Sequence, residues 1–254
     1  MRMDLHAAAR QALACLDLTS LNEADSAADV EALCRRAQTE FGPVAAVCVW
    51  PRFVAQARAL LPAAIKVAAV ANFPDGALDL ARALADVEAI AAAGADEVDV
   101  VLPFRALMAG QAAEAAEFLA EVRHASRPLT LKVIIESGEL KTTELIAEAT
   151  RLALMAGADF VKTSTGKSPV SATPQAATVM LGEIAASGLP HAGFKASGGI
   201  RTVAEAQVYL QLAADKLGAD ALTPQRLRFG ASALLSDILA TLSGHVPAAT
   251  TSAY

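Results

Sequence analysis

Residues 156–167 read Ala156-Gly-Ala-Asp-Phe-Val-Lys-Thr-Ser-Thr-Gly-Lys167, and they join a helix end, a short apolar strand and a glycine-rich turn. The opening tetrapeptide has related copies at Ala93-Gly-Ala-Asp96 and Leu217-Gly-Ala-Asp220, 63 residues before and 61 residues after this one. In each copy the glycine stands where a left-handed residue ends a helix, and we expect a strand to follow. The repeat therefore predicts pairs of strand–helix units, with roughly 31 residues in each unit.

Apolar runs of strand length alternate with helical patterns on both sides of this copy. Leu80, Leu84 and Val87 belong to a stripe between the second and third runs, and their spacing indicates a helix. The motif Thr202-x-x-Glu205 is a capping box that begins a helix after the sixth run. The eight expected strands, of which the last two are weak, are Val44–Trp50, Ile65–Ala71, Glu97–Leu102, Leu129–Glu136, Phe160–Ser164, Gly193–Ala196, Asp220–Leu222 and Arg228–Gly230.

This alternation predicts an α/β fold, a TIM (β/α)8 barrel that occupies residues 1–254 as one domain. Extra N-terminal helices would precede the first strand, and a flexible C-terminal tail would occupy about residues 244–254. An open doubly wound sheet is the alternative fold. It is less favoured because no Gly-x-Gly-x-x-Gly turn follows the first expected strand.

The composition excludes several classes of protein. Hydrophobic residues make up 54% of the chain and charged residues 19%, which supports a sizeable core. The net charge of −6 argues against nonspecific binding of nucleic acid, and no apolar run has the length of a signal region or a membrane span. Three cysteines without a Cys-x-x-Cys pair indicate reduced thiols, so we expect a cytoplasmic protein. Alanine and leucine on the barrel helices would suit a homodimer, although no pattern selects one.

Lys162 and Lys195 lie in apolar runs just before glycine-rich turns. Either lysine alone could simply extend its side chain to solvent. On neighbouring strands, however, two ammonium groups about 6 Å apart would repel by about 2.8 kcal/mol at an effective dielectric near 20. This repulsion would lower a lysine pKa by about two units and supply the neutral amine that attacks a carbonyl. The residues alone do not decide which lysine attacks.

Asp99 and Lys162 each follow an aspartate of the repeat by three residues. Because alternate strands of an eight-stranded barrel fill the same interior layer, we expect both side chains to face inward at a similar height. Asp99 would then balance the lysines and move protons, or would be a structural carboxylate. Lys132, on the strand between them, would join the same charge network or pair with Glu136 or Glu97.

Glycine-rich turns after the fifth, sixth and eighth expected strands supply a candidate phosphate site. They read Gly166-Lys167, Ser197-Gly-Gly-Ile-Arg201 and Phe229-Gly-Ala-Ser232. Backbone N–H groups at such turns and at helix starts bind anions, and barrels place these sites after their last strands. The four histidines are scattered without zinc-ligand spacing, so we expect neither a metal nor another cofactor.

Over almost its whole length the chain resembles the deoxyribose-phosphate aldolase family. The resemblance is specific because several long motifs occur in order. These motifs are Cys48-Val-Trp-Pro-Arg-Phe53, Asn72-Phe-Pro74, Gly94-Ala-Asp-Glu-Val-Asp-Val-Val101, Leu131-Lys-Val-Ile-Ile-Glu136, Phe160-Val-Lys-Thr-Ser-Thr-Gly-Lys167, Gly193-Phe-Lys195 with Gly198-Gly199, and Arg228-Phe-Gly-Ala-Ser232.

The resemblance implies a class I, metal-independent aldolase, a carbon–carbon lyase of deoxyribonucleotide catabolism. Its reaction is the reversible cleavage of 2-deoxy-D-ribose 5-phosphate to acetaldehyde and D-glyceraldehyde 3-phosphate, so the expected partners are small phosphorylated sugars and aldehydes. By motif position Lys162 forms the Schiff base, Lys195 lowers its pKa, and Asp99 transfers protons through ordered water. The resemblance also assigns substrate binding to Asp17, Thr19, Cys48, Lys132, Thr165, Gly166, Lys167, Gly198, Gly199, Arg201, Gly230 and Ser232.

Two further positions bear on this resemblance. Family members often end in a tyrosine that reaches the active site on a mobile tail, and Tyr254 is the last residue here. Family members also often carry a serine where this chain has Ala233, so one phosphate hydrogen bond would be missing. A transaldolase-like or ketose-bisphosphate aldolase is a second interpretation of the same residues, and a catalytically inactive phosphosugar-binding barrel is a third.

Overall fold

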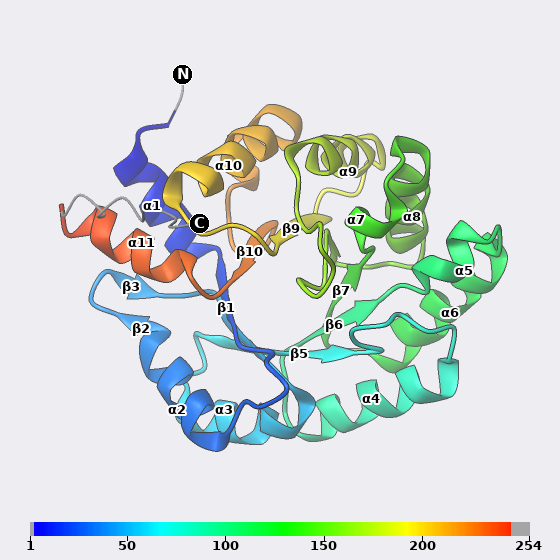
Figure 1. Cartoon of the computed structure of the whole chain (residues 1–254), viewed down its shortest axis with the longest axis horizontal. Helices are drawn as coiled ribbons and strands as arrows, with labels where there is room; N and C mark the ends of the chain where they lie inside the picture. Colours follow the sequence, from blue (N-terminus) through cyan, green and yellow to red (C-terminus); the bar gives the residue numbers. More distant parts are fainter. Residues whose placement is uncertain (1–2, 245–254) are drawn as a thin grey trace.

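A computed structural model describes residues 3–244 of the chain. Its barrel strands are β1 (Leu16–Thr19), β4 (Ala46–Val49), β5 (Lys66–Ala71), β6 (Glu97–Val101), β7 (Thr130–Ile134), β8 (Phe160–Lys162), β9 (Gly193–Ser197) and β10 (Leu227–Ala231). Within the described residues these eight parallel strands close in the order β1-β10-β9-β8-β7-β6-β5-β4, and β4 pairs with β1 (Figure 1). A separate antiparallel ribbon joins β2 (Gln38–Thr39) to β3 (Gly42–Pro43).

Helices connect the barrel strands and surround them (Figure 1). The α-helices are α1 (Leu5–Ala14), α2 (Ala27–Arg36), α3 (Val54–Leu60), α4 (Leu80–Ala92), α5 (Phe104–Met108), α6 (Ala112–Ala125), α7 (Ser137–Leu140), α8 (Thr143–Met155), α9 (Pro174–Ala186), α10 (Val203–Leu217) and α11 (Leu234–Leu242). Two short 3-10 helices are η1 (Pro51–Phe53) and η2 (Ala219–Ala221). Helix α1 precedes β1 and packs beside α10 and α11.

The predicted TIM (β/α)8 barrel is confirmed, with two corrections to its strands. The first strand is β1, which sequence reasoning missed because its four residues alternate apolar and polar side chains and give too short a signal. The strand predicted at Asp220–Leu222 is wrong, because this segment overlaps η2 and lies outside the sheet. Of the described helices, α1 therefore stands alone before the first strand, and α2 is an ordinary connection between β1 and β4.

The repeated glycines end helices as the sequence predicts. Gly94, Gly157 and Gly218 follow α4, α8 and α10 with φ angles of 87°, 83° and 87°, a region that favours glycine. Strands β6 and β8 begin shortly after the first two glycines, whereas η2 follows the third. The capping box of Thr202 and Glu205 is also confirmed at the start of α10.

Helix α4 buries a face that shares only Val87 with the predicted stripe. Ala83, Val87 and Ile90 are buried, whereas Leu80 and Leu84 are only partly buried. Interiors are close-packed, so a small side chain fits where a helix approaches the sheet closely. In this alanine-rich chain the face toward the barrel is therefore not the face with the largest side chains.

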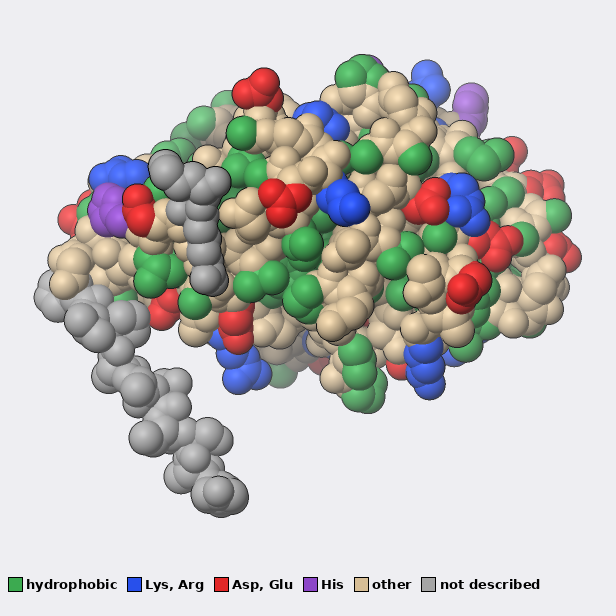
Figure 2. Space-filling model, turned by 90° about the horizontal axis from the view of Figure 1, so that it is seen from above, with side chains coloured by type: hydrophobic (Ala, Val, Ile, Leu, Met, Phe, Trp, Pro, Cys, Tyr) green, Lys and Arg blue, Asp and Glu red, His purple; other side chains and the backbone are tan. Residues whose placement is uncertain are grey.

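The barrel interior holds charged side chains, while apolar side chains pack between the sheet and the helices. Successive residues of a strand face opposite sides of the sheet, so Glu97 and Asp99 point into the barrel and Val98 points toward the helices. On the outer face shown in Figure 2, acidic and basic side chains are interspersed. No helix within residues 3–244 combines the length and hydropathy needed to cross a membrane.

Candidate active site

Lys162 is the last residue of β8, and its side chain is only 3% exposed. Its Nζ donates to Asp99 Oδ2 at 2.7 Å. Asp99 lies two strands away on β6 and is fully buried. The expectation that Asp99 and Lys162 face inward at a similar height is therefore confirmed, and Lys162 does not extend to solvent.

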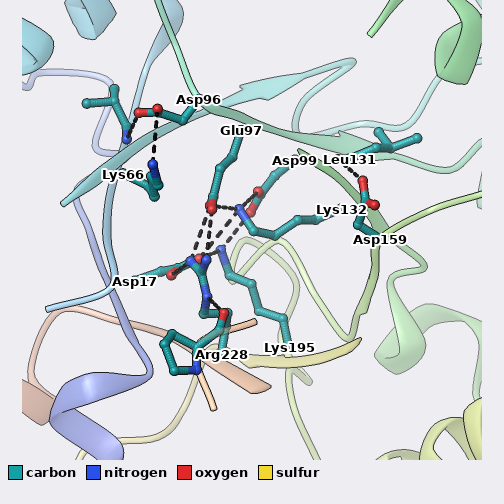
Figure 3. Close-up of polar contacts among 12 residues, drawn as sticks. Asp17, Lys66, Asp96, Glu97, Asp99, Leu131, Lys132, Asp159, Lys195 and Arg228 are labelled. Atoms are coloured by element: carbon teal, nitrogen blue, oxygen red, sulfur yellow. Dashed lines mark hydrogen bonds and ion pairs between the residues drawn. The ribbon is translucent and has the colours of Figure 1, made fainter. Parts of the chain in front are cut away.

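Lys195 and Lys132 complete a group of three lysines around Asp99. Lys162 and Lys195 are register partners on β8 and β9, and Lys195 Nζ donates to the same Asp99 Oδ2 at 2.8 Å. Lys132 Nζ donates to Asp99 Oδ1 at 2.9 Å and to Glu97 Oε2 at 2.5 Å (Figure 3). Lys132 thus belongs to the charge network and also pairs with Glu97.

Asp17 and Arg228 extend this network across the barrel (Figure 3). Asp17 Oδ2 accepts from Lys195 Nζ at 2.5 Å, and Asp17 Oδ1 accepts from Arg228 Nη1 at 2.6 Å. Arg228 Nη2 also donates to Glu97 Oε1 at 2.8 Å. We call the connected set the buried ionic cluster, and its members are Asp17, Glu97, Asp99, Lys132, Lys162, Lys195 and Arg228.

The surroundings of the two register-paired lysines separate their pKa values. Burial lowers the pKa of Lys162, and the charge of Lys195 lowers it further while Asp99 opposes both effects. Burial also disfavours the charged form of Lys195, but Asp17 and Asp99 outweigh burial and raise its pKa. Burial likewise opposes ionisation of Asp99, yet the three lysines hold the pKa of Asp99 well below its ordinary value. This environment favours Lys162 as the neutral amine.

Lys162 lines a cleft of about 290 Å³ at the C-terminal ends of the barrel strands. The walls of this cleft come from the segments after β1, β8, β9 and β10, at residues 19–22, 165–167, 197–201 and 230–233. Most predicted substrate-binding residues lie in these walls. They are Thr19, Thr165, Gly166, Lys167, Gly198, Gly199, Arg201, Gly230 and Ser232.

The turns after β8 and β9 pack directly against each other. Gly166 and Gly198 have φ angles of 79° and 82°. A Cβ on Gly198 would lie 2.5 Å from Ser171 Oγ and 3.3 Å from Gly166 Cα, so a side chain at Gly198 would collide with the neighbouring loop. Glycine therefore lets backbone form this wall of the cleft.

Positive charge and free backbone N–H groups meet at the cleft. Helix α11 begins there, and its N-cap residue Ala233 makes no side-chain capping bond. The first N–H groups of a helix have no intrahelical partners and attract anions. Lys167 and Arg201 also line the cleft, where Lys167 Nζ donates to the carbonyl of Leu21 at 2.7 Å. These walls suit an anionic group such as a phosphate.

Three predicted substrate-binding residues, Asp17, Cys48 and Lys132, are fully buried and do not line the cleft. Cys48 lies on β4 as the register partner of Thr19, and burial raises the pKa of its thiol. Thr19 does line the cleft, and its Oγ1 donates to the carbonyl of Asp17 at 2.8 Å. Tyr254 and the predicted tail from residue 245 onward lie outside the described residues.

Sequence reasoning gave no site role to Glu136 or Arg228. Glu136 Oε2 accepts from Thr165 Oγ1 at 2.5 Å, and Oε1 accepts from Ser168 Oγ at 3.1 Å. Glu136 therefore holds the loop that follows β8. The signal available for both residues was a charge within or directly after an apolar strand run, the same signal that identified Lys162.

The site therefore combines an amine of lowered pKa with a cleft whose walls suit an anion. Such an amine can add to a carbonyl carbon of a substrate that the cleft holds by its anionic group. Within residues 3–244 no group of three His, Cys, Asp or Glu side chains is arranged to hold a metal ion.

Comparisons with known proteins agree with this chemistry. A family model described as DeoC/LacD family aldolase matches residues 11–239. A curated deoxyribose-phosphate aldolase from Agrobacterium fabrum (strain C58) is 48% identical over 250 residues, which are 97% of this chain and 96% of that protein. The crystal structure of a candidate deoxyribose-phosphate aldolase from Coccidioides immitis has a TM-score of 0.81 at 28% identity, over 92% of this chain and 86% of that chain. One from Toxoplasma gondii ME49 has a TM-score of 0.86 over 95% and 96% of the chains, and at 23% identity this is a likeness of fold.

Proposed function

The chain belongs to the DeoC/LacD family of aldolases, and we propose that it cleaves 2-deoxy-D-ribose 5-phosphate reversibly to acetaldehyde and D-glyceraldehyde 3-phosphate. It would act as a class I aldolase, a carbon–carbon lyase that uses a lysine Schiff base. The observation that supports this function best is the Lys162 amine, which binds Asp99 at 2.7 Å and lines a cleft with walls suited to phosphate.

Lys162 starts the reaction. Its neutral Nζ adds to C1 of the ring-opened sugar, and loss of water from the resulting carbinolamine leaves an iminium. Lys195 stays protonated because Asp17 and Asp99 raise its pKa, and its charge helps to keep the pKa of Lys162 low. Positioned acid–base groups typically contribute about 10²–10⁴-fold to the proton transfers of such steps.

The iminium then accepts the electron pair of the C2–C3 bond. As the C3 hydroxyl loses its proton, the C2–C3 bond breaks and C3 becomes the aldehyde carbon of glyceraldehyde 3-phosphate. The enamine that remains takes a proton at C2, and water hydrolyses the new iminium to release acetaldehyde and Lys162. Asp99 remains ionised because its pKa is well below its ordinary value. When it relays a proton between water and the lysines, its carboxylate would therefore accept that proton only transiently and return to the ionised form.

The phosphate would bind where the turns after β8 and β9 face the start of α11. Lys167, Arg201 and Ser232 offer side chains there, and the glycine turns and the uncapped helix offer N–H groups. Binding at the phosphate orients the distant C1 carbonyl toward Lys162, so that binding energy lowers the barrier of the chemical step.

Borohydride trapping tests the proposal. The protein is incubated with 2-deoxy-D-ribose 5-phosphate and borohydride, digested, and searched by mass for a reduced adduct. The proposal expects the adduct on Lys162, and a chain incubated with borohydride alone is the control. No adduct, or an adduct on another lysine, would reject the assignment of Lys162.

A donor panel separates the alternative functions. Use of acetaldehyde as donor with glyceraldehyde 3-phosphate supports the proposed reaction, whereas use of dihydroxyacetone indicates a transaldolase-like or ketose-bisphosphate aldolase. Measurable retro-aldol turnover excludes an inactive phosphosugar-binding barrel. The homodimer and the cytoplasmic location remain predictions, which sedimentation and cell fractionation test.

A further inference from the structure

The buried ionic cluster has four basic and three acidic members among the described residues, so it carries one excess positive charge when every group is ionised. All of its side chains are almost fully buried, and water screens their charges poorly. We propose that Arg228 is a positioning residue that sets this charge balance, so that Lys162 is the cluster member that loses its proton. This inference rests on the proposed function of Lys162.

Lys162 has the least compensation of the four cations. Within the described residues it contacts one carboxylate, that of Asp99, which it shares with Lys132 and Lys195. Lys195 contacts two carboxylates and Lys132 contacts three. Arg228 also contacts two, and a guanidinium keeps its proton in proteins. Loss of a proton therefore costs least at Lys162, which is also the cluster lysine that lines the cleft.

Arg228 acts from a distance, because it is not part of the cleft wall. Its Nε donates to the carbonyl of Pro224, and its guanidinium lies 5.4 Å from the ring centroid of Phe160. Arg228 and Lys195 bind different oxygens of Asp17, at 2.6 Å and 2.5 Å. Lys132 also lies 3.6 Å from Asp17, so three cations share this carboxylate, and the charge of Arg228 limits how much negative charge remains for the lysines.

Other titratable groups near Lys162 do not alter the charge balance of the buried ionic cluster. Cys48, on β4, is a buried thiol whose raised pKa keeps it neutral. Glu136, after β7, directs its carboxylate to Thr165 and Ser168 of the loop. Lys167 and Arg201, after β8 and β9, are exposed at the cleft and therefore well screened.

Removal of the Arg228 charge would leave three carboxylates facing two permanently charged lysines. Lys162 would then hold its proton to balance the cluster, and its neutral form would become scarce at neutral pH. Removal of the Glu97 charge at the same time would restore equal numbers of anions and cations. The two substitutions should therefore oppose each other in their effect on Lys162.

The test measures kcat/KM for deoxyribose phosphate cleavage between pH 5 and 9, since its acid limb reports the ionisation of groups in the free enzyme. Arg228→Met is expected to move the acid limb to higher pH by about one unit or more, and Arg228→Met with Glu97→Gln is expected to move it back. Arg228→Lys keeps the charge and should leave the limb near its wild-type position. Arg226→Met is the matched control, because Arg226 binds the carbonyl of Ala192 outside the cluster.

A second measurement labels Lys162 with acetaldehyde and cyanoborohydride across the same pH range and quantifies the labelled peptide by mass. This measurement needs no catalytic turnover. It therefore separates failure of this inference from failure of the proposed function. If Arg228→Met does not fold, Glu97→Gln alone is informative, because loss of one anion should move the limb to lower pH. The inference is overturned if the acid limb of Arg228→Met stays at its wild-type pH. It is also overturned if the double variant shows the same shift as Arg228→Met, or if the acid limb of Glu97→Gln stays at its wild-type pH.

Discussion

Lys162 and Lys195 are register partners on adjacent strands, and their side-chain nitrogens bind one oxygen of Asp99 at 2.7 Å and 2.8 Å. A single carboxylate oxygen cannot fully compensate two ammonium groups so close together. Asp17 breaks the equivalence of the pair because it binds Lys195 and not Lys162. The pKa of Lys195 rises and that of Lys162 falls, so in the proposed mechanism Lys195 supplies a fixed charge and Lys162 supplies the amine.

Replacement of Lys162 by alanine should abolish aldolase activity, with kcat/KM falling by about 10⁴-fold or more, because the amine proposed to form the Schiff base is removed. The fold should persist, since the cluster loses its least compensated cation. Steady-state kinetics and circular dichroism check both expectations. Lys66→Ala is the control, because Lys66 is half exposed and pairs with Asp96, which does not belong to the buried ionic cluster (Figure 3). Comparable activity in Lys162→Ala and wild type would contradict the mechanism.

Replacement of Lys195 by methionine should shift the acid limb of kcat/KM upward by about two pH units, because the repulsion that lowers the pKa of Lys162 disappears. Lys162 must be neutral to attack, so activity is lost as pH falls through its pKa, and a raised pKa extends that loss to neutral pH. A pH–rate profile from pH 5 to 10 measures the shift, with Lys66→Met as control. A profile that is lower at every pH but has the same limb would indicate a different role for Lys195.

The repeat and the strand-end lysines were sufficient to predict the barrel and the inner group of Asp99, Lys162 and Lys195. Register explains this success, because a fixed offset from the repeated aspartates places side chains in the same layer. Strand β1 was not predicted because its four residues are too few to show a periodic pattern. Strand β10 was expected only weakly, and the inward direction of Arg228 was not anticipated.

Long-range pairing limited the rest of the site prediction. Asp17 and Arg228 meet although 211 residues separate them, and Glu97 and Arg228 are 131 residues apart. Closure of the barrel brings the first strand beside the last, and no local pattern records that contact. The glycine turns could be predicted, because each of them directly follows a strand in the local sequence. The structure brings the turns after β8, β9 and β10 together at one cleft.

Replacement of Gly230 by alanine should lower kcat, because a Cβ there would lie 2.3 Å from Ser197 Oγ and 3.1 Å from Lys195 Cε. The added methyl group would displace Lys195 from Asp99 or strain β10, so a loss of about tenfold or more in kcat and about 1–3 kcal/mol in stability is expected. Kinetics and chemical denaturation measure the two effects.

Gly182→Ala is a matched control for this substitution. Gly182 lies within α9, and nothing approaches within 4 Å of the position that its Cβ would take. Alanine favours a helix interior over glycine, so this variant should be more stable by about 0.5–1 kcal/mol and equally active. Equal kinetics in both glycine variants would show that Gly230 does not position Lys195.

Replacement of Ala233 by serine should tighten binding of the phosphorylated substrate. Ala233 is exposed, lines the cleft and is the N-cap of α11 without a side-chain capping bond. Residue 233 has helical backbone angles, φ −78° and ψ −29°, so a serine hydroxyl there would cap the helix only after a change to the extended conformation of a capping residue; such a cap stabilises a helix by about 1 kcal/mol. Alternatively, the hydroxyl would donate to the phosphate, and a hydrogen bond to a charged group contributes about 1.5–3 kcal/mol. We expect a KM for deoxyribose 5-phosphate about tenfold lower, with little change for unphosphorylated deoxyribose.

Thermal unfolding with and without inorganic phosphate distinguishes the two roles, because a cap alone raises the melting temperature equally in both conditions. Equal changes in KM for the two sugars would place the phosphate away from α11.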